Sequence, residues 1–194
     1  MRICVFGAAS AHIDNKYINE VEELCKELAS HGHSLVFGAG ATGLMGAAAR
    51  GFKAGKGYIH GVIPKFFLEE GVEAIFTDCE KMTYTETMAE RKKAMEDDAE
   101  AFIIAPGGVG TFEEFFEVLT LKQLGRHEKA IVVFNIDGYY DELEKFMATA
   151  IDRKFVTGKC NLLYTCFSKR EEVIKYLEDY KPLGISWKQL KLGE

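Results

Sequence analysis

Apolar residues along the chain follow two alternating patterns, short continuous runs and longer stretches with helical spacing. Residues 2–6 form a short apolar run, and in residues 15–30 the apolar positions Val21, Leu24 and Leu28 are spaced by three and four. A short apolar run predicts a buried strand, and a spacing of three to four predicts an amphipathic helix. The same alternation continues to the last third of the chain.

The expected strands are residues 2–6, 34–37, 58–63, 101–105, 130–134 and 161–166, with a short one at 74–77. The expected helices are residues 15–30, 47–53, 83–98, 111–124, 140–155 and 171–180, and residues 65–71 are expected to form a loop with a helical turn. Strands that alternate with long helices predict a parallel sheet covered on both faces. We therefore expect the α/β class: one Rossmann-like, doubly wound parallel sheet with helices on both faces, in a single domain over residues 1–194.

Three of these strands end in glycine-rich segments, at residues 7–10, 38–46 and 107–111. Ligands of doubly wound sheets bind beyond the carboxyl ends of the strands, so neighbouring strands would merge the three segments into one pocket. The third segment also opens a helix, whose first N–H groups and positive dipole end suit an anion such as phosphate. Two carboxylates, Glu113 and Glu114, follow directly, a position suited to a part of the ligand that becomes cationic.

The segment 38–43 has the spacing GxGxxG, which is typical of dinucleotide-binding loops. The acidic residue that such loops carry about 20 positions later would fall near Ile63, where none stands. Gly43 is followed by Leu44 and Met45 instead of Lys and Ser or Thr, which argues against a P-loop. Tight turning and close packing explain these glycines as well as direct ligand contact does.

Thr111 and Glu114 also admit a structural explanation. A threonine at the start of a helix and a glutamate three residues later can form a capping box, in which the glutamate returns to the N–H of the cap residue. An ordinary cap does not need three glycines in the preceding residues 107–110. This favours a ligand site over a cap alone.

On the expected helix 83–98, Met88, Arg91, Lys92 and Met95 share one face because they stand at positions i, i+3, i+4 and i+7. Two interpretations are open. The two basic side chains can extend from the edge of the core into solvent. Alternatively, the guanidinium and the ammonium are directed at a phosphate.

Charge, apolar runs and the cysteine and histidine positions exclude several classes of protein and site. The formal charge of −6 argues against broad nucleic-acid binding, which needs a basic face. No apolar run reaches the ~18 residues of a membrane span, and the N-terminus shows no signal-peptide pattern. The five cysteines include no CxxC pair, which suggests reduced thiols in a cytoplasmic protein. The five histidines lack metal-ligand spacing, so no metal site is expected.

Three motifs resemble those of a known family. Residues 106–114, PGGVGTFEE, resemble its PGGxGTxxE signature, and residues 88–92, MAERK, resemble its MxxRK motif. Residues 38–46 resemble its GGGxxGLMG segment, with Ala39 in place of the middle glycine. From residue 2 to about residue 180 the chain thus resembles the LOG ("Lonely guy") family of cytokinin riboside 5′-monophosphate phosphoribohydrolases, long labelled possible lysine decarboxylases.

The resemblance implies a homodimer that cleaves the N-glycosidic bond of a nucleoside 5′-monophosphate, without a cofactor, to a free purine-type base and ribose 5-phosphate. By position, Arg91 and Glu114 match the pair held to be catalytic in that family. The positions that match its substrate contacts are Lys92, Gly107, Gly108, Val109, Gly110, Thr111, Phe112, Glu113 and Thr120. A family acidic contact lies in the loop after the third strand, where Glu69 or Glu70 can take it, and we favour Glu70.

Breaking a C1′–N bond builds positive charge on the ribose ring. We therefore expect Glu114 to stabilise that charge or to orient the attacking water, while Arg91 clamps phosphate or ribose. The main alternative is a nucleotide or molybdenum-cofactor carrier that hydrolyses nothing. A decarboxylase would need pyridoxal phosphate on a lysine, and no sequence context marks such a lysine. The apolar residues Phe115, Phe116 and Leu119 can serve either a dimer contact or the core.

Overall fold

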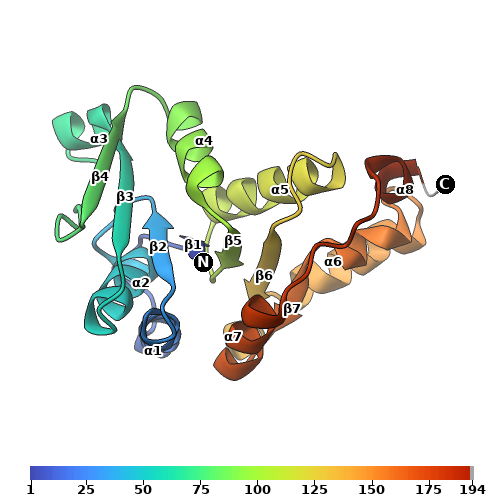
Figure 1. Ribbon diagram of the computed structural model, residues 1–194, viewed down its shortest axis with the longest axis horizontal. Helices are drawn as coiled ribbons and strands as arrows, with labels where there is room; N and C mark the ends of the chain where they lie inside the picture. Colours follow the sequence, from blue (N-terminus) through green and yellow to red (C-terminus); the bar gives the residue numbers. More distant parts are fainter. Residues whose placement is uncertain (193–194) are drawn as a thin grey trace.

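The apolar runs pair into one seven-stranded parallel sheet with the order β4-β3-β2-β1-β5-β6-β7 (Figure 1). The computed structural model describes residues 1–192. The strands are β1 (Arg2–Phe6), β2 (Ser34–Phe37), β3 (Ile59–Pro64), β4 (Lys81–Thr85), β5 (Ala101–Ile104), β6 (Ala130–Phe134) and β7 (Thr165–Phe167). The predicted domain extends to residue 194, and residues 193–194 lie outside the described part.

The helices are α1 (Asn15–Ser30), α2 (Gly43–Ala54), α3 (Lys65–Glu70), α4 (Met88–Asp98), α5 (Val109–Gln123), α6 (Asp141–Asp152), α7 (Arg170–Asp179) and α8 (Trp187–Leu192). Two short 3-10 turns, η1 (Ile136–Gly138) and η2 (Gly158–Leu162), flank α6. None of the described helices has both the length and the apolar character needed to cross a bilayer.

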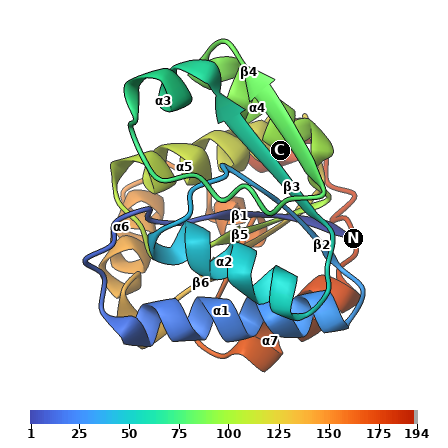
Figure 2. The ribbon, with the colours of Figure 1, turned by 90° about the vertical axis from the view of Figure 1, so that its left-hand side faces the viewer.

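Alternate residues of each strand face opposite layers of helices. On β1, Ile3 and Val5 belong to the apolar cluster that includes α1, α2 and α7, whereas Cys4 and Phe6 belong to the cluster that includes α4, α5 and α6. Figure 2 shows α1, α2 and α7 below the sheet and α4 and α5 above it. The predicted doubly wound sheet with helices on both faces is confirmed.

Residues 83–87 were predicted to open a helix, and this is wrong. Lys81–Thr85 instead forms β4, which pairs with β3 from His60↔Lys81 to Pro64↔Thr85. Helix α4 begins only after Thr87, whose side chain accepts from the N–H of Glu90 in a capping box. Threonine and tyrosine favour a strand surface, and an open edge of β3 was available to pair with them.

Two further strand predictions need correction, at residues 74–77 and 161–166. The first segment makes only an antiparallel bridge, Gly40↔Ile75, outside the sheet. The second divides into η2 and β7, because only 165–167 reach the edge of β6. Helix α8 was not predicted, and it packs at the far end of α5 (Figure 1).

The strand order reverses between β1 and β5, with β2 on the other side of β1. These are the three strands that end in glycine-rich segments. Their carboxyl ends therefore lie side by side at the switch point of the sheet, where ligands of this fold class bind.

Candidate functional site

A cavity of about 370 Å³ opens at the switch point. Its lining residues come from the three glycine-rich segments, from α4 and α5, and from the connection between β3 and β4. They are Gly7, Ala8, Ala9, Ser10, Met45, Phe67, Glu73, Arg91, Gly108, Gly110, Thr111 and Glu114. The three segments thus form one pocket, as the sequence predicted for neighbouring strands.

Backbone hydrogen bonds join the three glycine-rich segments to one another. The N–H of Ala8, after β1, donates to the carbonyl of Pro106 at 3.1 Å, after β5. The carbonyl of Ala8 accepts from the N–H groups of Leu44 and Met45 in the first turn of α2, at 2.8 and 3.4 Å. The carbonyl of Ala8 therefore occupies the N-terminus of α2, which is no longer free for an anion.

The segment 38–46 is shaped mainly by close packing. Gly43 has φ +58°, and a Cβ atom there would lie 2.5 Å from the carbonyl oxygen of Ala8. Ala39 also lies in the left-handed region, with φ 62°, at a cost of about 1–2 kcal/mol for a residue with a Cβ atom. This explains why the similar family motif has glycine at that position. The packing explanation of these glycines holds for Gly43.

The N-terminus of α5 is arranged differently. Its N-cap is Gly108, and within residues 1–192 no side chain caps it. The predicted helix start at Thr111 was two residues late, so Thr111 is inside the first turn and the capping-box explanation for it is wrong. A Cβ atom at Gly108 or Gly110 would meet nothing within 4 Å, because both face open space. The first N–H groups of α5 are thus left for an anion.

Two tyrosines that the sequence did not single out fix the turn before α5. The hydroxyl of Tyr139 donates to the carbonyl of Gly107 at 2.5 Å, and the buried Tyr140 donates to the carbonyl of Ala105 at 2.8 Å. These two hydrogen bonds hold the carbonyls of the turn and so fix its backbone. The position of both residues just beyond β6, the neighbour of β5, was the signal that could have identified them.

Arg91 is 7% exposed and reaches across the ends of β2 and β3. Its Nη2 donates to the carbonyl of Gly38 at 2.9 Å and its Nε to the carbonyl of Val62 at 3.3 Å. The guanidinium lies 5.5 Å from the ring centroid of Phe67. A Cβ atom at residue 38 would lie 1.7 Å from Nη2, so Gly38 makes room for the arginine. Arg91 is therefore a rigid cation at the cavity wall.

Glu114 lies in the second turn of α5 and lines the same cavity as Arg91. Burial raises the pKa of its carboxyl to about 7, against the opposing effect of the nearby Arg91. A half-buried carboxyl with a pKa near neutrality, next to a buried guanidinium, is typical of a catalytic group. The structure brings together the two residues predicted to be catalytic.

The acidic residue of the β3–β4 connection that lines the cavity is Glu73, not Glu69 or Glu70. Glu70 ends α3 and is exposed. Burial raises the pKa of Glu73, and Arg91 partly offsets this. Glu73 is held in place because the N–H of Phe76 donates to the carbonyl of Ala39 at 2.8 Å, which fixes the following segment against the loop after β2. An isolated antiparallel bridge leaves no periodic pattern in the sequence, so the place of Glu73 could not be predicted from it.

Five other predicted contacts lie outside the cavity lining: Lys92, Gly107, Val109, Phe112 and Glu113. Lys92 forms ion pairs with Glu113 and Glu117 on α5. The ring of Phe112 packs edge-on against Tyr140, and Val109 is exposed. Thr111 is buried, and a Cβ atom added at Gly107 would lie 2.1 Å from its Oγ1.

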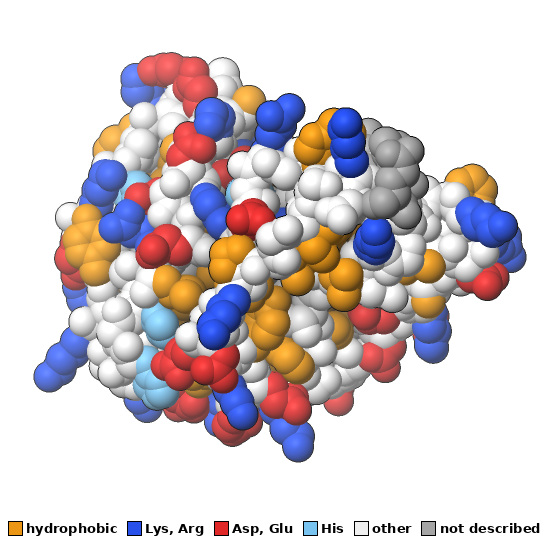
Figure 3. Space-filling model, turned by 45° about the vertical axis from the view of Figure 1, so that its right-hand side comes forward, with side chains coloured by type: hydrophobic (Ala, Val, Ile, Leu, Met, Phe, Trp, Pro, Cys, Tyr) orange, Lys and Arg blue, Asp and Glu red, His pale blue; other side chains and the backbone are white. Residues whose placement is uncertain are grey.

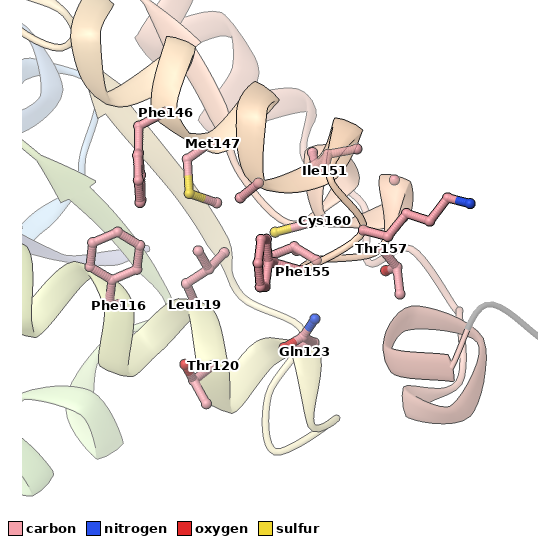
Figure 4. A pocket seen from close by; sticks show the side chains of 14 residues that line it. Phe116, Leu119, Thr120, Gln123, Phe146, Met147, Ile151, Phe155, Thr157 and Cys160 are labelled. Carbon is pink, nitrogen blue, oxygen red and sulfur yellow. The ribbon is translucent and has the colours of Figure 1, made fainter.

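Thr120 lies in a separate groove of about 670 Å³ between α5 and α6. Figure 4 shows Phe116, Leu119 and Thr120 on one helix, with Phe146, Met147 and Ile151 across from them. Phe155, also in this groove, is 84% exposed. The sequence left open whether Phe115, Phe116 and Leu119 serve the core or a dimer contact. Phe115 and Leu119 are buried, whereas Phe116 is exposed.

Surface charge and possible metal ligands indicate no second candidate site among residues 1–192. On the face shown in Figure 3, basic and acidic side chains are interspersed. Within residues 1–192 no three His, Cys, Asp or Glu side chains gather as a metal site would require. The five cysteines are free, and burial raises the pKa of each thiol.

Comparison with known proteins identifies the family. A family model described as "Possible lysine decarboxylase" matches residues 45–177. An Arabidopsis thaliana protein, cytokinin riboside 5'-monophosphate phosphoribohydrolase LOG3, is 34% identical over 99% of this chain and 91% of its own. The chain belongs to the LOG family. A second Arabidopsis LOG protein, LOG1, is 35% identical over 93% of this chain and 84% of its own.

Solved structures resemble this LOG chain in fold. The molybdenum cofactor carrier protein of Chlamydomonas reinhardtii aligns with a TM-score of 0.69 at 23% identity, over 91% of this chain and 95% of that one. At this identity the similarity concerns the fold alone.

Proposed function

We propose that this LOG protein hydrolyses the N-glycosidic bond of nucleoside 5′-monophosphates, cytokinin riboside 5′-monophosphate or AMP, to free base and ribose 5-phosphate. The observation that carries the proposal is one cavity in which the uncapped N-terminus of α5 lies beside Arg91 and Glu114. The names of the Arabidopsis relatives support the same reaction.

In the proposed complex, the phosphate binds the first N–H groups of α5 and Arg91 clamps phosphate or ribose. The C1′–N bond breaks, its electrons leave with the base, and the ribose ring gains positive charge. The carboxylate of Glu114 stabilises that charge or orients the water whose oxygen bonds to C1′. The proton that this water loses balances the one that the departing base takes up to become the free base. Binding the distant phosphate lowers the barrier at C1′ because it fixes the sugar against Glu114.

The acidic substrate contact assigned to Glu70 passes in this proposal to Glu73, which lines the cavity. Gly107, Val109, Phe112, Glu113 and Thr120 stay predicted contacts from family resemblance. The contact that the same resemblance implies for Lys92 is the one that its ion pairs with Glu113 and Glu117 argue against. The proposal also places the protein in the cytoplasm, which its free cysteines support.

Base release tests the function. AMP, GMP, CMP and isopentenyladenosine monophosphate are incubated with the protein and the free base is quantified, with adenosine as the control that lacks phosphate. We expect release from the adenine nucleotides and at least 10²-fold lower kcat/KM with adenosine. Tight nucleotide binding without any base release would instead indicate a carrier.

Gly110→Ala is expected to separate binding from stability. The added methyl group enters the cavity, so the KM for AMP should rise at least tenfold. Because alanine favours a helix over glycine by about 0.5–1 kcal/mol, the melting temperature should not fall. Gly107→Ala is the contrast: its Cβ atom would lie 2.1 Å from Oγ1 of Thr111, so this variant should be less stable. Unchanged AMP kinetics in Gly110→Ala would place the phosphate elsewhere.

We propose that the α5–α6 groove joins two copies of the chain in a homodimer. Its exposed apolar side chains Phe116, Phe146 and Phe155 support an isologous contact. Phe155→Asp should convert the dimer to a monomer in light scattering, since it would bury a charge. Tyr58→Asp, at an exposed aromatic position outside the groove, is the control. A wild-type monomer at micromolar concentration would contradict the proposal.

A further inference from the structure

Two pairs of adjacent residues face each other across α4 and α5, Arg91-Lys92 and Glu113-Glu114. One member of each pair, Arg91 and Glu114, lines the cavity. The other members, Lys92 and Glu113, form an ion pair with each other. In each pair, therefore, one residue lines the cavity and the other forms the contact between α4 and α5.

Lys92 is engaged twice on α5. Besides Glu113, its Nζ lies 2.7 Å from Oε2 of Glu117, one turn further along the helix. The lysine side chain is 17% exposed. Burial lowers the pKa of its ammonium, but the hydrogen bonds to the two carboxylates outweigh this and raise the pKa to about 12. An ammonium has three N–H donors, and two carboxylates already accept from that of Lys92. Lys92 is therefore a poor candidate for direct contact with a phosphate in the cavity.

We propose that Lys92 is a positioning residue that ties α4 to α5, so that Arg91 and Glu114 keep their relative places in the cavity wall. This rests on the proposed hydrolase function. Each helix supplies one of the two cavity groups, so the separation of those groups depends on how the helices are held together. The ion pairs of Lys92 with Glu113 and Glu117 fix that separation.

The charge of Lys92 has a second effect. Glu114 faces Arg91 and Lys92 from α4, Glu113 and Glu117 from its own helix, and the thiol of Cys4 on β1, while Glu73 borders the same cavity. The two cations lower the pKa of Glu114 and the carboxylates raise it. Glu96, whose pKa is raised to about 7, lies near Lys92 and Glu117. Without Lys92, Glu114 keeps the compensating charge of Arg91, and Glu96 that of Lys93, but each loses one cation.

The test is Lys92→Met, with Lys93→Met as the matched control. Lys93 is the next residue, is exposed, and pairs only with Asp97 of its own helix among residues 1–192. In Lys92→Met we expect kcat for AMP to fall about tenfold, KM to change less than threefold, and the acidic limb of kcat/KM to move up by about one pH unit. Lys93→Met should behave as wild type. A KM at least tenfold higher with an unmoved limb would overturn the proposal and make Lys92 a phosphate ligand.

A charge exchange distinguishes the two roles again. Lys92→Glu and Glu113→Lys should each lower the melting temperature and kcat, and the double variant should recover a large part of both, because the ion pair is restored in the opposite direction. Lack of recovery in the double variant, with both single variants folded, would contradict the positioning role. Melting temperature needs no substrate, so this test remains valid if wild-type protein releases no base, the result that would refute the hydrolase function.

Discussion

Glu114→Gln is expected to lower kcat for AMP at least 10²-fold and to change nucleotide affinity less than threefold. The amide keeps the shape of the side chain in the cavity but removes the negative charge that faces the forming ribose cation. Loss of one preorganised electrostatic group costs other enzymes about 10²–10³ in kcat. The measurement is base release under saturating AMP, with affinity from calorimetry.

Glu142→Gln is the control. Glu142 is exposed on α6, so this substitution makes the same chemical change away from the cavity. Turnover by Glu114→Gln within tenfold of wild type would remove Glu114 from the mechanism. A large loss of affinity with normal kcat would make it a binding group.

The raised pKa of Glu114 predicts how both activity and stability change with pH. Activity requires the carboxylate, so kcat/KM should rise with pH up to about 7 and then level off. Stability runs the other way: the fold favours the protonated acid, so stability falls as the pH rises from the ordinary carboxyl pKa to about 7. Glu114→Gln should therefore be more stable than wild type at pH 8, by up to roughly 3 kcal/mol. Equal stability at pH 8 would contradict this.

Arg91→Lys is expected to lower kcat/KM for AMP at least 10²-fold although the charge is kept. The guanidinium reaches the carbonyls of Gly38 and Val62 with two separate nitrogens, and an ammonium at the end of a flexible chain cannot reproduce this geometry. One buried carbonyl is left without a donor, which costs about 1–3 kcal/mol of stability. Base release and chemical denaturation measure the two effects.

Gly38→Ala checks the same point without touching a charged group. Its methyl group would occupy the place of the Nη2 atom of Arg91, so the variant should lose activity along with Arg91→Lys. Full activity in Gly38→Ala would show that the contact of the Arg91 guanidinium with Gly38, just after β2, is not needed for catalysis.

The sequence allowed the central part of the site to be predicted. The apolar runs gave the strands whose ends carry the glycines, and the motifs placed Arg91 and Glu114 correctly at one cavity. What could not be predicted depends on contacts between distant segments. The segment that follows Glu73 is held against the loop after β2 by backbone hydrogen bonds, from Ala41 to Ala74 and from Phe76 to Ala39. Lys92 pairs with two carboxylates of α5 and does not line the cavity.

The errors in element boundaries have the same origin. Thr83 and its neighbours fit a helix start by local pattern, but the open edge of β3 offered a ladder of hydrogen bonds that local pattern does not contain. Thr111 fitted an N-cap, yet the helix starts at Val109 with Gly108 as its N-cap. In both cases partners far along the chain decided the outcome.

The connection from β3 to β4 supplies Phe67 and Glu73 to the cavity, whereas the amides of α5, Arg91 and Glu114 come from elsewhere. One wall of the cavity and the groups proposed to act on the C1′–N bond thus belong to separate pieces of chain. A different connection between β3 and β4 would change that wall and leave the amides of α5, Arg91 and Glu114 in place.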